Sequence, residues 1–539
     1  MLRLYVDRFD GRTVKSFMHL PRLRTALVAG SAMLVVATTA PVVLALTPAH
    51  AATTSMSTAL DQILADTRLD GASVGVQVRD AASGTVLYSH DTDRRLIPAS
   101  NDKLLTSTAA LEVLGTDYRF HTKVLTGGQR YGSVLAGSVY LKGGGDPTML
   151  AADYDQLAGQ LAQTGVRVVT GDLVADDTFF DSQRLGADWA WDDEPYSYAA
   201  QISALTLAPD TDYDAGSVIV QTTGTTAGHA PTVTLVPANN SVRVDNRATT
   251  GPAGSANTLD VTRDHGTDTM VVTGSIPAGV PTDKEWMAVW DPTGYAAGVF
   301  RDALARHGVK VLGRTAEEAT PAGAHEVADH PSMTLAQLLV PFLKLSNNIH
   351  AEALTKAMGQ KVAGVGSWSA GIAAEHTVLS AMGVDVSTIR QVDGSGLSRQ
   401  DLLTNQQITN LLVAARGKPW FGTWYSALPI AGVADRMVGG TLSSRMAGTP
   451  AANNLHGKTG SMTGVNALSG YVTDASGRLL VFSAIINNYL GAVTPLLDAI
   501  GVTLAKSTPD GVTPAAVPRA PRNAPVTDDA VECSWVKAC

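Results

Sequence analysis

The chain has 539 residues, a formal net charge of −9, 45% hydrophobic residues and 17% charged residues. This composition is typical of a globular protein, and the length predicts two to four domains. The negative charge and the lack of any dense Lys/Arg run exclude nucleic acid as an expected partner.

The first 51 residues have the pattern of an export signal. Arg22 and Arg24 precede an apolar run over 25–46, and Ala49-His50-Ala51 forms a small-x-small cleavage site. We therefore expect a signal peptide over 1–51 and an extracytoplasmic protein, either secreted or associated with the cell wall. The alternative is a retained anchor, because about 20 apolar residues can cross a bilayer. A membrane is an expected partner only if the signal is retained.

After the signal, hydrophobic periodicity predicts helices and strands at both ends of the chain. A helix over 56–68 and a hairpin of strands 72–80 and 84–90 come first. An apolar helix that begins near Ser100 and runs through Leu114 follows. In the C-terminal half we expect three helices, then two strands, then a closing helix, at 333–344, 367–382, 402–415, 466–473, 479–487 and 494–506.

The middle of the chain has a different texture, with short β-like runs broken by Gly, Pro, Asp and Asn. We therefore expect an α/β domain made of 52–120 and 335–506, with one or more β-rich domains inserted over 121–334. The β-like runs include 166–172, 232–236 and 269–274.

The last segment, 507–539, is rich in Pro, Ala and Val, and we expect it to be a flexible tail. Both cysteines of the chain, Cys533 and Cys539, lie there. They could close a small loop in an oxidising compartment, but neither lies where a rigid scaffold would hold a catalytic thiol.

Three short motifs could carry chemistry, and the first is Ser100-Asn101-Asp102-Lys103. Ser-x-x-Lys places two side chains on neighbouring turns of a helix face, so that the amine can reach the hydroxyl. Ser100 stands at a predicted helix start, where backbone N–H groups favour developing negative charge. The alternative is an N-cap serine without chemistry. A second match, Ser534 to Lys537, lies in the tail, where we interpret it as chance.

The second motif is Ser346-Asn347-Asn348, which follows the predicted helix 333–344. Simple helix termination is its alternative interpretation, since Asn is well suited to a helix end. The third motif, Lys458-Thr459-Gly460, combines a cation, a hydroxyl and a residue without a side chain. This combination suits an edge strand that admits a carboxylate ligand beside its backbone.

The order of the three motifs resembles that of the penicillin-recognising serine enzymes. Further segments resemble one branch of them, the class C low-molecular-mass penicillin-binding proteins, which are D-Ala-D-Ala carboxypeptidases/endopeptidases of the penicillin-binding-protein-4 type. The resemblance runs from about Leu60 to Ala505. One departure is His350, where an aromatic residue such as Tyr is expected. The segments are Lys142-Gly143-Gly144-Gly145-Asp146-Pro147-Thr148, Gly171-Asp172-Leu173 with Asp176-Asp177, Asp393-Gly394-Ser395-Gly396-Leu397-Ser398-Arg399, and the eight residues from Lys458 to Val465.

The resemblance implies an α/β fold, the penicillin-binding/β-lactamase-like transpeptidase domain, in which helices flank an antiparallel sheet. It also implies a hydrolase that cleaves peptidoglycan stem peptides through an acyl-enzyme and is acylated by β-lactam antibiotics. Ser100 would attack the carbonyl of the penultimate D-Ala, and Lys103, if neutral, would accept its proton. Ser346 would relay a proton to the leaving amine, and Asn348 would hold the substrate's peptide carbonyl.

The resemblance implies substrate-binding residues in the third motif as well. Lys458 and Thr459, followed by Gly460, would bind the terminal carboxylate of the substrate. The backbone N–H groups of Ser100 and Ser461 would stabilise the oxyanion, each lowering the barrier by roughly 3 kcal/mol.

A further expectation concerns the third residue of the stem peptide, for which we expect meso-diaminopimelate. Its side chain ends in an ammonium and a carboxylate, so recognition needs an acid and a base; we assign Asp192 and Arg399. Trp189 and Trp191 could form a wall for the aliphatic part of that side chain. Alternatively, these two aromatics pack inside the insert while the neighbouring acids face solvent.

Other classes of protein fit the sequence less well. A serine β-lactamase shares the motifs but lacks so long an insert, and an idle wall-binding protein would not need Ser100 and Lys103. An α/β-hydrolase elbow fails because Gly71-Ala72-Ser73-Val74-Gly75 enters a strand. The 12 histidines lack the spacing of a zinc peptidase, so we expect neither a metal nor a cofactor.

Overall fold

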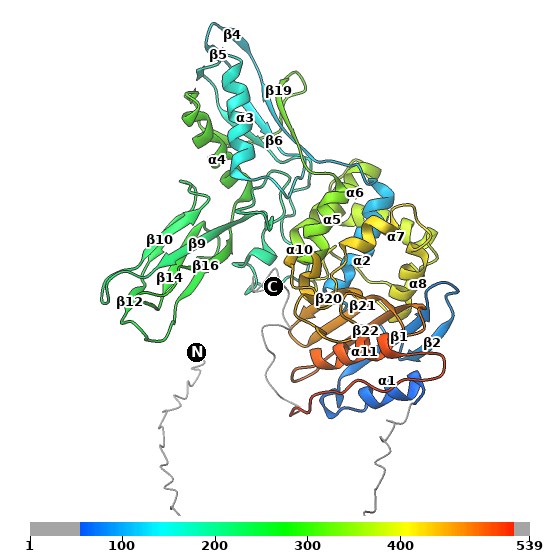
Figure 1. The fold of residues 1–539 in the computed structure, drawn as a ribbon. Coiled ribbons are helices and arrows are strands. Elements are labelled where there is room, and N and C mark those ends of the chain that lie inside the picture. Colours follow the sequence, from blue (N-terminus) through cyan, green and yellow to red (C-terminus); the bar gives the residue numbers. More distant parts are fainter. Residues whose placement is uncertain (1–53, 522–539) are drawn as a thin grey trace, which may run out of the picture. The chain divides into compact units, whose positions relative to one another are not determined.

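The computed structural model describes residues 54–521. A five-stranded antiparallel sheet forms the centre of the part that the two ends of this range build, at the lower right of Figure 1. The strand order is β2-β1-β22-β21-β20, so the two ends of the chain build one sheet. The predicted hairpin and the two later strands are confirmed, and the Lys-Thr-Gly motif lies on the edge strand, as its composition indicated. The strands are β1 (Ser73–Asp80), β2 (Val86–His90), β20 (His456–Met462), β21 (Val465–Thr473) and β22 (Leu479–Asn487).

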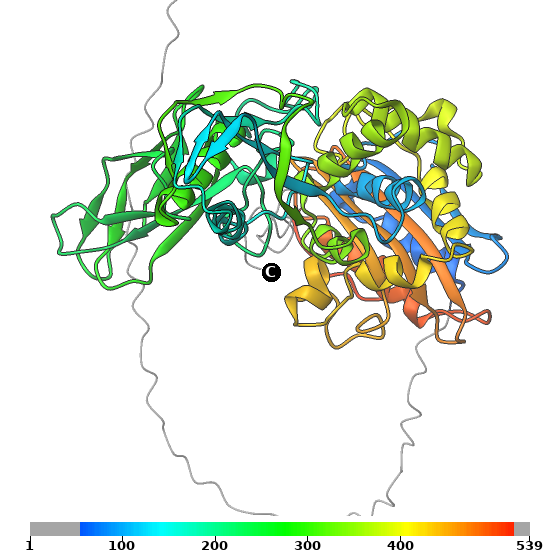
Figure 2. The same cartoon turned by 90° about the horizontal axis from the view of Figure 1, so that it is seen from above.

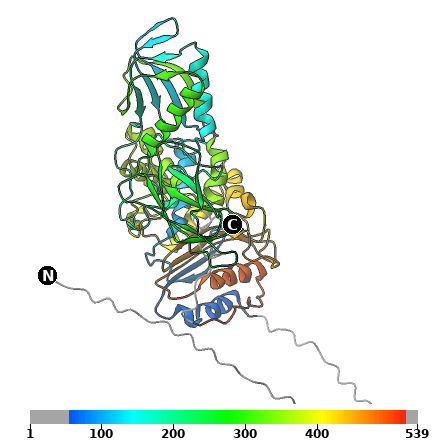
Figure 3. The same cartoon turned by 90° about the vertical axis from the view of Figure 1, so that its left-hand side faces the viewer.

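Both faces of this sheet are buried. Successive side chains of a strand point to opposite faces, so each strand contributes to an apolar cluster on either side. On β22, Leu480 and Phe482 join an apolar cluster with α1 and α11, whereas Val481 and Ile485 join a second cluster on the opposite face. Figure 3 shows α1 and α11, at the bottom of that view, against the first face. The two helices are α1 (Met56–Leu64) and α11 (Thr494–Lys506).

The helices that cover the second face surround α2, whose residues from Lys103 to Leu111 are all buried. Seen from above, α6 and α7 lie together on one side of the sheet (Figure 2). The 3₁₀ turn η2 (Ala99–Asp102) leads into α2 (Lys103–Val113). The other helices are α5 (Leu335–Lys344), α6 (Asn348–Ala363), α7 (Trp368–Ala381), α8 (Asn405–Ala415), α9 (Phe421–Ala427) and α10 (Arg436–Gly439), followed by the 3₁₀ turn η5 (Gly440–Leu442).

Three of these helices, α6, α9 and α10, were not predicted. The second motif does follow a helix, but it also begins α6, because the Asn347 side chain caps α6 by accepting from the His350 backbone N–H. All residues from Asn348 to Gly359 are buried, so α6 has no apolar stripe that a sequence pattern could reveal.

Residues 121–331 form separate sheets and two helices. The predicted strands at 232–236 and 269–274 are present as β10 and β14, whereas only Val168–Val169 of 166–172 is a strand. Helices α3 and α4 were missed, so this segment is less purely β than expected. The helices are α3 (Ala151–Gln163) and α4 (Pro292–Arg306).

The strands of this segment are arranged in five sheets, with orders β17-β7-β5-β4, β18-β8-β6-β3-β19, β10-β9-β16, β11-β14-β13 and β12-β15. Their bounds are β3 (His121–Thr126), β4 (Gln129–Tyr131), β5 (Val134–Ala136), β6 (Val139–Lys142), β7 (Val168–Val169), β8 (Leu173–Asp176), β9 (Ser217–Thr223), β10 (Thr232–Val236), β11 (Arg243–Asn246), β12 (Thr249–Gly251), β13 (Asp260–Arg263), β14 (Thr269–Thr273), β15 (Ser275–Pro277), β16 (Asp283–Ala288), β17 (Lys310–Val311), β18 (Thr315–Glu317) and β19 (His325–Pro331).

The first part of the tail differs from the expected flexible segment. Val512 is buried and pairs with Thr54, and the Arg68 guanidinium donates to the carbonyl of Pro518. Apolar contact therefore extends the packed chain beyond 507. The signal at 1–51 and the two cysteines lie outside the described residues, and within 54–521 no helix is long and apolar enough to cross a membrane.

Candidate active site

The Ser-x-x-Lys motif brings its two side chains together at the start of α2. Lys103 Nζ lies 2.7 Å from Ser100 Oγ, 2.7 Å from Asn348 Oδ1 and 2.9 Å from the carbonyl oxygen of Ser395. Ser100 is 5% exposed and Lys103 is fully buried. The amine is thus held between the hydroxyl and two oxygens that can only accept a hydrogen bond.

The Ser-x-Asn and Lys-Thr-Gly motifs meet in the same way. Lys458 Nζ donates to Ser346 Oγ at 2.7 Å and to the carbonyl of Thr459 at 2.8 Å. The Thr459 hydroxyl lies 2.8 Å from that of Thr441 in η5. Because Asn348 contacts Lys103, the structure connects all three motifs through hydrogen bonds between side chains.

Gly460 allows the edge strand to approach the Ser100 backbone. A Cβ atom at Gly460 would lie 2.8 Å from the carbonyl oxygen of Pro98 and 3.1 Å from the Ser100 nitrogen. No side chain fits there without displacing backbone. The next residue, Ser461, pairs with Asn466 of β21.

The Asp393–Arg399 loop supplies a part of the site that sequence reasoning did not assign. The Asp393 carboxylate accepts from the backbone N–H groups of Ser395, Gly396 and Ser398, and from the indole N–H of Trp189 at 2.9 Å. These bonds hold the turn whose Ser395 carbonyl contacts Lys103. No sequence pattern could have indicated this role, because it belongs to a backbone carbonyl.

Two further residues of the site were also missed. The Tyr198 carbonyl accepts from the Asn348 side chain at 2.9 Å, and Thr441 contacts Thr459. Tyr198 lies in the insert, and Thr441 lies in η5. Both contacts join segments that are far apart in the sequence.

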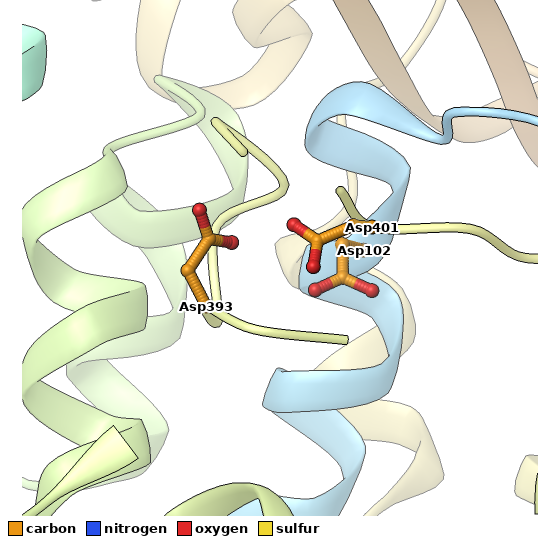
Figure 4. Close-up of side chains that lie close together, drawn as sticks. All are labelled: Asp102, Asp393 and Asp401. Atoms are coloured by element: carbon orange, nitrogen blue, oxygen red, sulfur yellow. The ribbon is translucent and has the colours of Figure 1, made fainter. Parts of the chain in front are cut away.

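Three buried carboxyl groups, from Asp102, Asp393 and Asp401, lie together beside the start of α2 (Figure 4). Asp102, Asp393 and Asp401 come close to one another, and each is fully buried. Burial, followed by neighbouring carboxylates, raises the pKa of both Asp102 and Asp401 well above the usual range. Burial likewise raises the pKa of Glu352 to about 7 and that of Glu375 to about 8.

Acidic groups close enough to share a cation occur twice in the described part of the chain. In the group of Asp102, Asp393 and Asp401, protonation of Asp102 and Asp401, whose pKa values are raised, reduces the repulsion between the carboxylates. The second group consists of Asp210, Asp212 and Asp214, and Arg436 supplies positive charge there through two bonds to the Asp212 carboxylate. Neither group needs a metal ion to account for its geometry.

Asp192 and Arg399 line one cavity of about 300 Å³, together with Tyr198, Leu397 and Met462 among others. The Arg399 guanidinium donates to the carbonyl of Thr463 at 2.8 Å. The same cavity contains Asp193, whose carboxylate accepts from the Tyr198 hydroxyl. An acid and a base thus lie at one hollow, as recognition of a zwitterionic group requires.

The two tryptophans do not form the expected wall. Trp189 packs edge-on against Trp368, with ring centroids 6.2 Å apart, and its N–H is bound to Asp393. Trp191 is 80% exposed. Neither residue lines the cavity that contains Asp192. The indole of Trp189 is instead hydrogen-bonded to the Asp393 loop.

A larger cavity, of about 430 Å³, lies between the strands that begin the insert and the C-terminal half of α6. Its lining includes Phe120, Lys142 and Lys361. Neither cavity is lined by a residue of the three motifs, but the smaller one includes Met462 and Thr463, which follow the Lys-Thr-Gly motif in the chain.

The fold and the connected motifs define a serine peptidase of the penicillin-recognising class. The chain belongs to the D-Ala-D-Ala carboxypeptidase 3 (S13) family, which it matches over residues 56–505. It is 46% identical over 490 residues to a D-alanyl-D-alanine carboxypeptidase of Actinomadura sp. (strain R39), with 89% of each chain covered. It is thus a class C low-molecular-mass penicillin-binding protein.

Solved structures show the same fold. The chain is 24% identical in sequence to penicillin binding protein 4 from Haemophilus influenzae, with a TM-score of 0.73 and coverage of 83% of this chain and 99% of that one. A second structure of that protein, complexed with a β-lactam, has a TM-score of 0.67 at the same identity and covers 83% of this chain and 98% of that one.

Proposed function

We propose that Ser100 is the nucleophile of a D-Ala-D-Ala carboxypeptidase/endopeptidase and that Lys103 is its general base. The contacts of Lys103 carry this proposal. Asn348 Oδ1 and the Ser395 carbonyl can only accept, so a neutral amine directs its two N–H bonds to them. The lone pair of that amine can accept the proton of the Ser100 hydroxyl, 2.7 Å away. Proton transfer to Lys103 accompanies attack on the penultimate D-Ala carbonyl.

The second pair supports departure of the D-Ala amine. Ser346 lies within 2.7 Å of Lys458 Nζ, so its hydroxyl can pass a proton to the leaving nitrogen while the ammonium stabilises the oxygen. Lys458 and Thr459, on the edge strand before Gly460, bind the terminal carboxylate. The N–H groups of Ser100 and Ser461 stabilise the oxyanion, and water completes hydrolysis of the acyl-enzyme.

The substrate class follows from this arrangement and from the named relatives. We infer that the enzyme acts on peptidoglycan stem peptides outside the cytoplasm, with residues 1–51 as its signal, and that β-lactams acylate Ser100. Mass spectrometry of the intact protein after brief penicillin exposure tests this. A stable adduct with the mass of one penicillin is expected, together with release of D-Ala from stem peptides. Rapid return to the unmodified mass would identify a β-lactamase instead.

We also propose that the cavity with Asp192 and Arg399 binds the end of the third stem residue, meso-diaminopimelate. The guanidinium suits the carboxylate of that side chain, because Arg binds planar anions through two parallel N–H bonds. Asp192 suits the ammonium on the same carbon. The aliphatic part lies against Leu397 and Met462, which line the same cavity.

Kinetics with two stem peptides test this assignment. Asp192→Ala and Arg399→Ala are expected to lower kcat/KM for a diaminopimelate-ended peptide about tenfold, with little change for an uncharged one. Arg399→Lys should already weaken the charged substrate. Arg390→Ala is the control, because Arg390 is exposed and bonds to Gln400 outside the cavity. Equal losses on both peptides, or none, would contradict the subsite and leave the peptidase assignment intact.

A further inference from the structure

The insert contacts the Ser-x-Asn motif directly, through the loop from Asp210 to Asp214. The side-chain amide of Asn347, the middle residue of the motif, donates to the Tyr213 carbonyl at 3.1 Å and to the Asp214 carboxylate at 3.2 Å. His350, one turn further along α6, contacts the same Tyr213 carbonyl at 3.0 Å through Nε2. One backbone carbonyl of the insert therefore accepts from both ends of the first turn of α6.

Asn347 lies between the two side chains that we assign to catalysis. Ser346 reaches Lys458, and Asn348 reaches Lys103. Asn347 also caps α6, because its Oδ1 accepts from the His350 backbone N–H at 3.2 Å. Its amide is thus bound on both sides, by α6 and by the insert, which sets the direction of the backbone between Ser346 and Asn348.

Ser346 has a conformation that needs such support. Its φ is 61°, in the left-handed region that a residue with a Cβ rarely adopts. A strained residue persists where its surroundings determine its geometry. Tyr213, on the opposite side of the contact, is also left-handed, with a φ of 59°. Two strained backbones therefore meet through the Asn347 amide.

The loop is itself held in place from two directions. The Asp212 carboxylate accepts hydrogen bonds from both terminal nitrogens of Arg436, a residue of α10. The indole N–H of Trp286, on β16, donates to Asp210 at 3.0 Å. Asp214 is 2% exposed, so its bond to Asn347 is shielded from water.

His350 keeps its donor role at ordinary pH. A carbonyl can only accept, so Nε2 must carry the hydrogen. Burial lowers the pKa of His350 to about 3, and the ring therefore remains neutral. The residue that departs from the family pattern is thus a fixed donor to the insert.

We propose that the Asp210–Asp214 loop is a positioning element of the active site, which sets Ser346 and Asn348 for acylation through Asn347 and His350. The insert then determines the geometry of the active site and is more than a separate structural domain. This inference rests on the roles proposed above for Ser346 and Asn348. A loop that only fastened the insert to the peptidase would affect the melting temperature and leave the chemical step unchanged.

Rapid-mixing acylation by a chromogenic β-lactam separates these roles, because it gives the binding constant and the first-order acylation rate separately. Asp214→Ala is expected to lower the acylation rate about tenfold or more, with a smaller change in binding. Asp214→Asn, which keeps an oxygen acceptor for Asn347, should restore the rate to within about threefold of wild type. The control is Asp268→Ala, since Asp268 accepts from the Trp290 and Asp291 backbones inside the insert and does not contact the motif.

Arg436→Ala provides a second variant should Asp214→Ala fail to fold. It removes the two Arg436–Asp212 hydrogen bonds, and it does not truncate a fully buried side chain. It is expected to slow acylation about threefold to tenfold. Wild-type acylation rates in folded Asp214→Ala or Arg436→Ala would overturn the proposal. Equal slowing in Asp268→Ala at a similar loss of melting temperature would also overturn it. Neither result depends on whether Ser100 is the nucleophile, which the Ser100→Ala variant tests separately.

Discussion

Ser100→Ala is expected to abolish covalent labelling by penicillin and to reduce release of D-Ala to background. The hydroxyl is 2.7 Å from Lys103 Nζ, at the start of α2, and it is the nucleophile that forms the acyl-enzyme in the mechanism proposed above. Removal of a nucleophile that forms a covalent intermediate typically lowers kcat by about 10⁶-fold. Mass spectrometry of the intact variant after penicillin exposure measures the outcome.

Ser534→Ala is the matched control for this experiment. Ser534 and Lys537 repeat the Ser-x-x-Lys string but lie outside the described residues. Labelling of this control should equal that of wild type. A penicillin adduct that persists in the folded Ser100 variant would show that the nucleophile has been misassigned.

Raising the pH from about 6 to about 9 is expected to destabilise the protein through two buried carboxyl groups, Glu352 beside the Asp393 loop and Glu375 beside α2. Burial raises the pKa of Glu375 to about 8 and that of Glu352 to about 7. An acid whose pKa is raised in the folded state binds its proton more tightly there than in the unfolded chain. Its stabilising effect is complete below the unfolded pKa and is lost as the pH rises through the folded value.

Glu375→Gln should remove part of this dependence, because an amide cannot ionise. The free energy of unfolding of wild type, relative to the variant, is expected to fall by on the order of 2 kcal/mol between about pH 6 and about pH 9. The comparison between the two proteins cancels other titrations, such as that of Lys344, whose pKa burial lowers to about 8. Urea denaturation at several pH values measures it.

Glu318→Gln is the control for the pH experiment, since Glu318 is exposed on the insert. Its stability should follow the wild-type curve. If Glu375→Gln also follows that curve, Glu375 does not hold its proton in the buried cluster.

The chemistry of this protein was readable from the sequence because short motifs encode it locally. Ser100 and Lys103 are three residues apart at the start of a helix, and Lys458, Thr459 and Gly460 are consecutive on one strand. Periods of 3.6 and 2.0 residues likewise predicted α5, α11 and the strands β21 and β22. The same rules missed α6, since a helix buried on all sides has no polar face to mark its period.

The meeting of the motifs was decided only by the tertiary structure. The Ser395 carbonyl at Lys103, the Tyr198 carbonyl at Asn348 and the Tyr213 carbonyl at Asn347 are all backbone groups, which every residue type supplies. No residue pattern marks them.

Trp189 and Trp191 illustrate the same division between sequence and structure. Their proximity to Asp192 in the sequence suggested a pocket wall, but Trp189 is bound to Asp393 and Trp191 is 80% exposed. The sequence by itself predicted the three motifs and most of the elements that carry them. The tertiary structure decided which backbone groups hold those side chains in place, because such contacts depend on chain segments that lie far apart in the sequence.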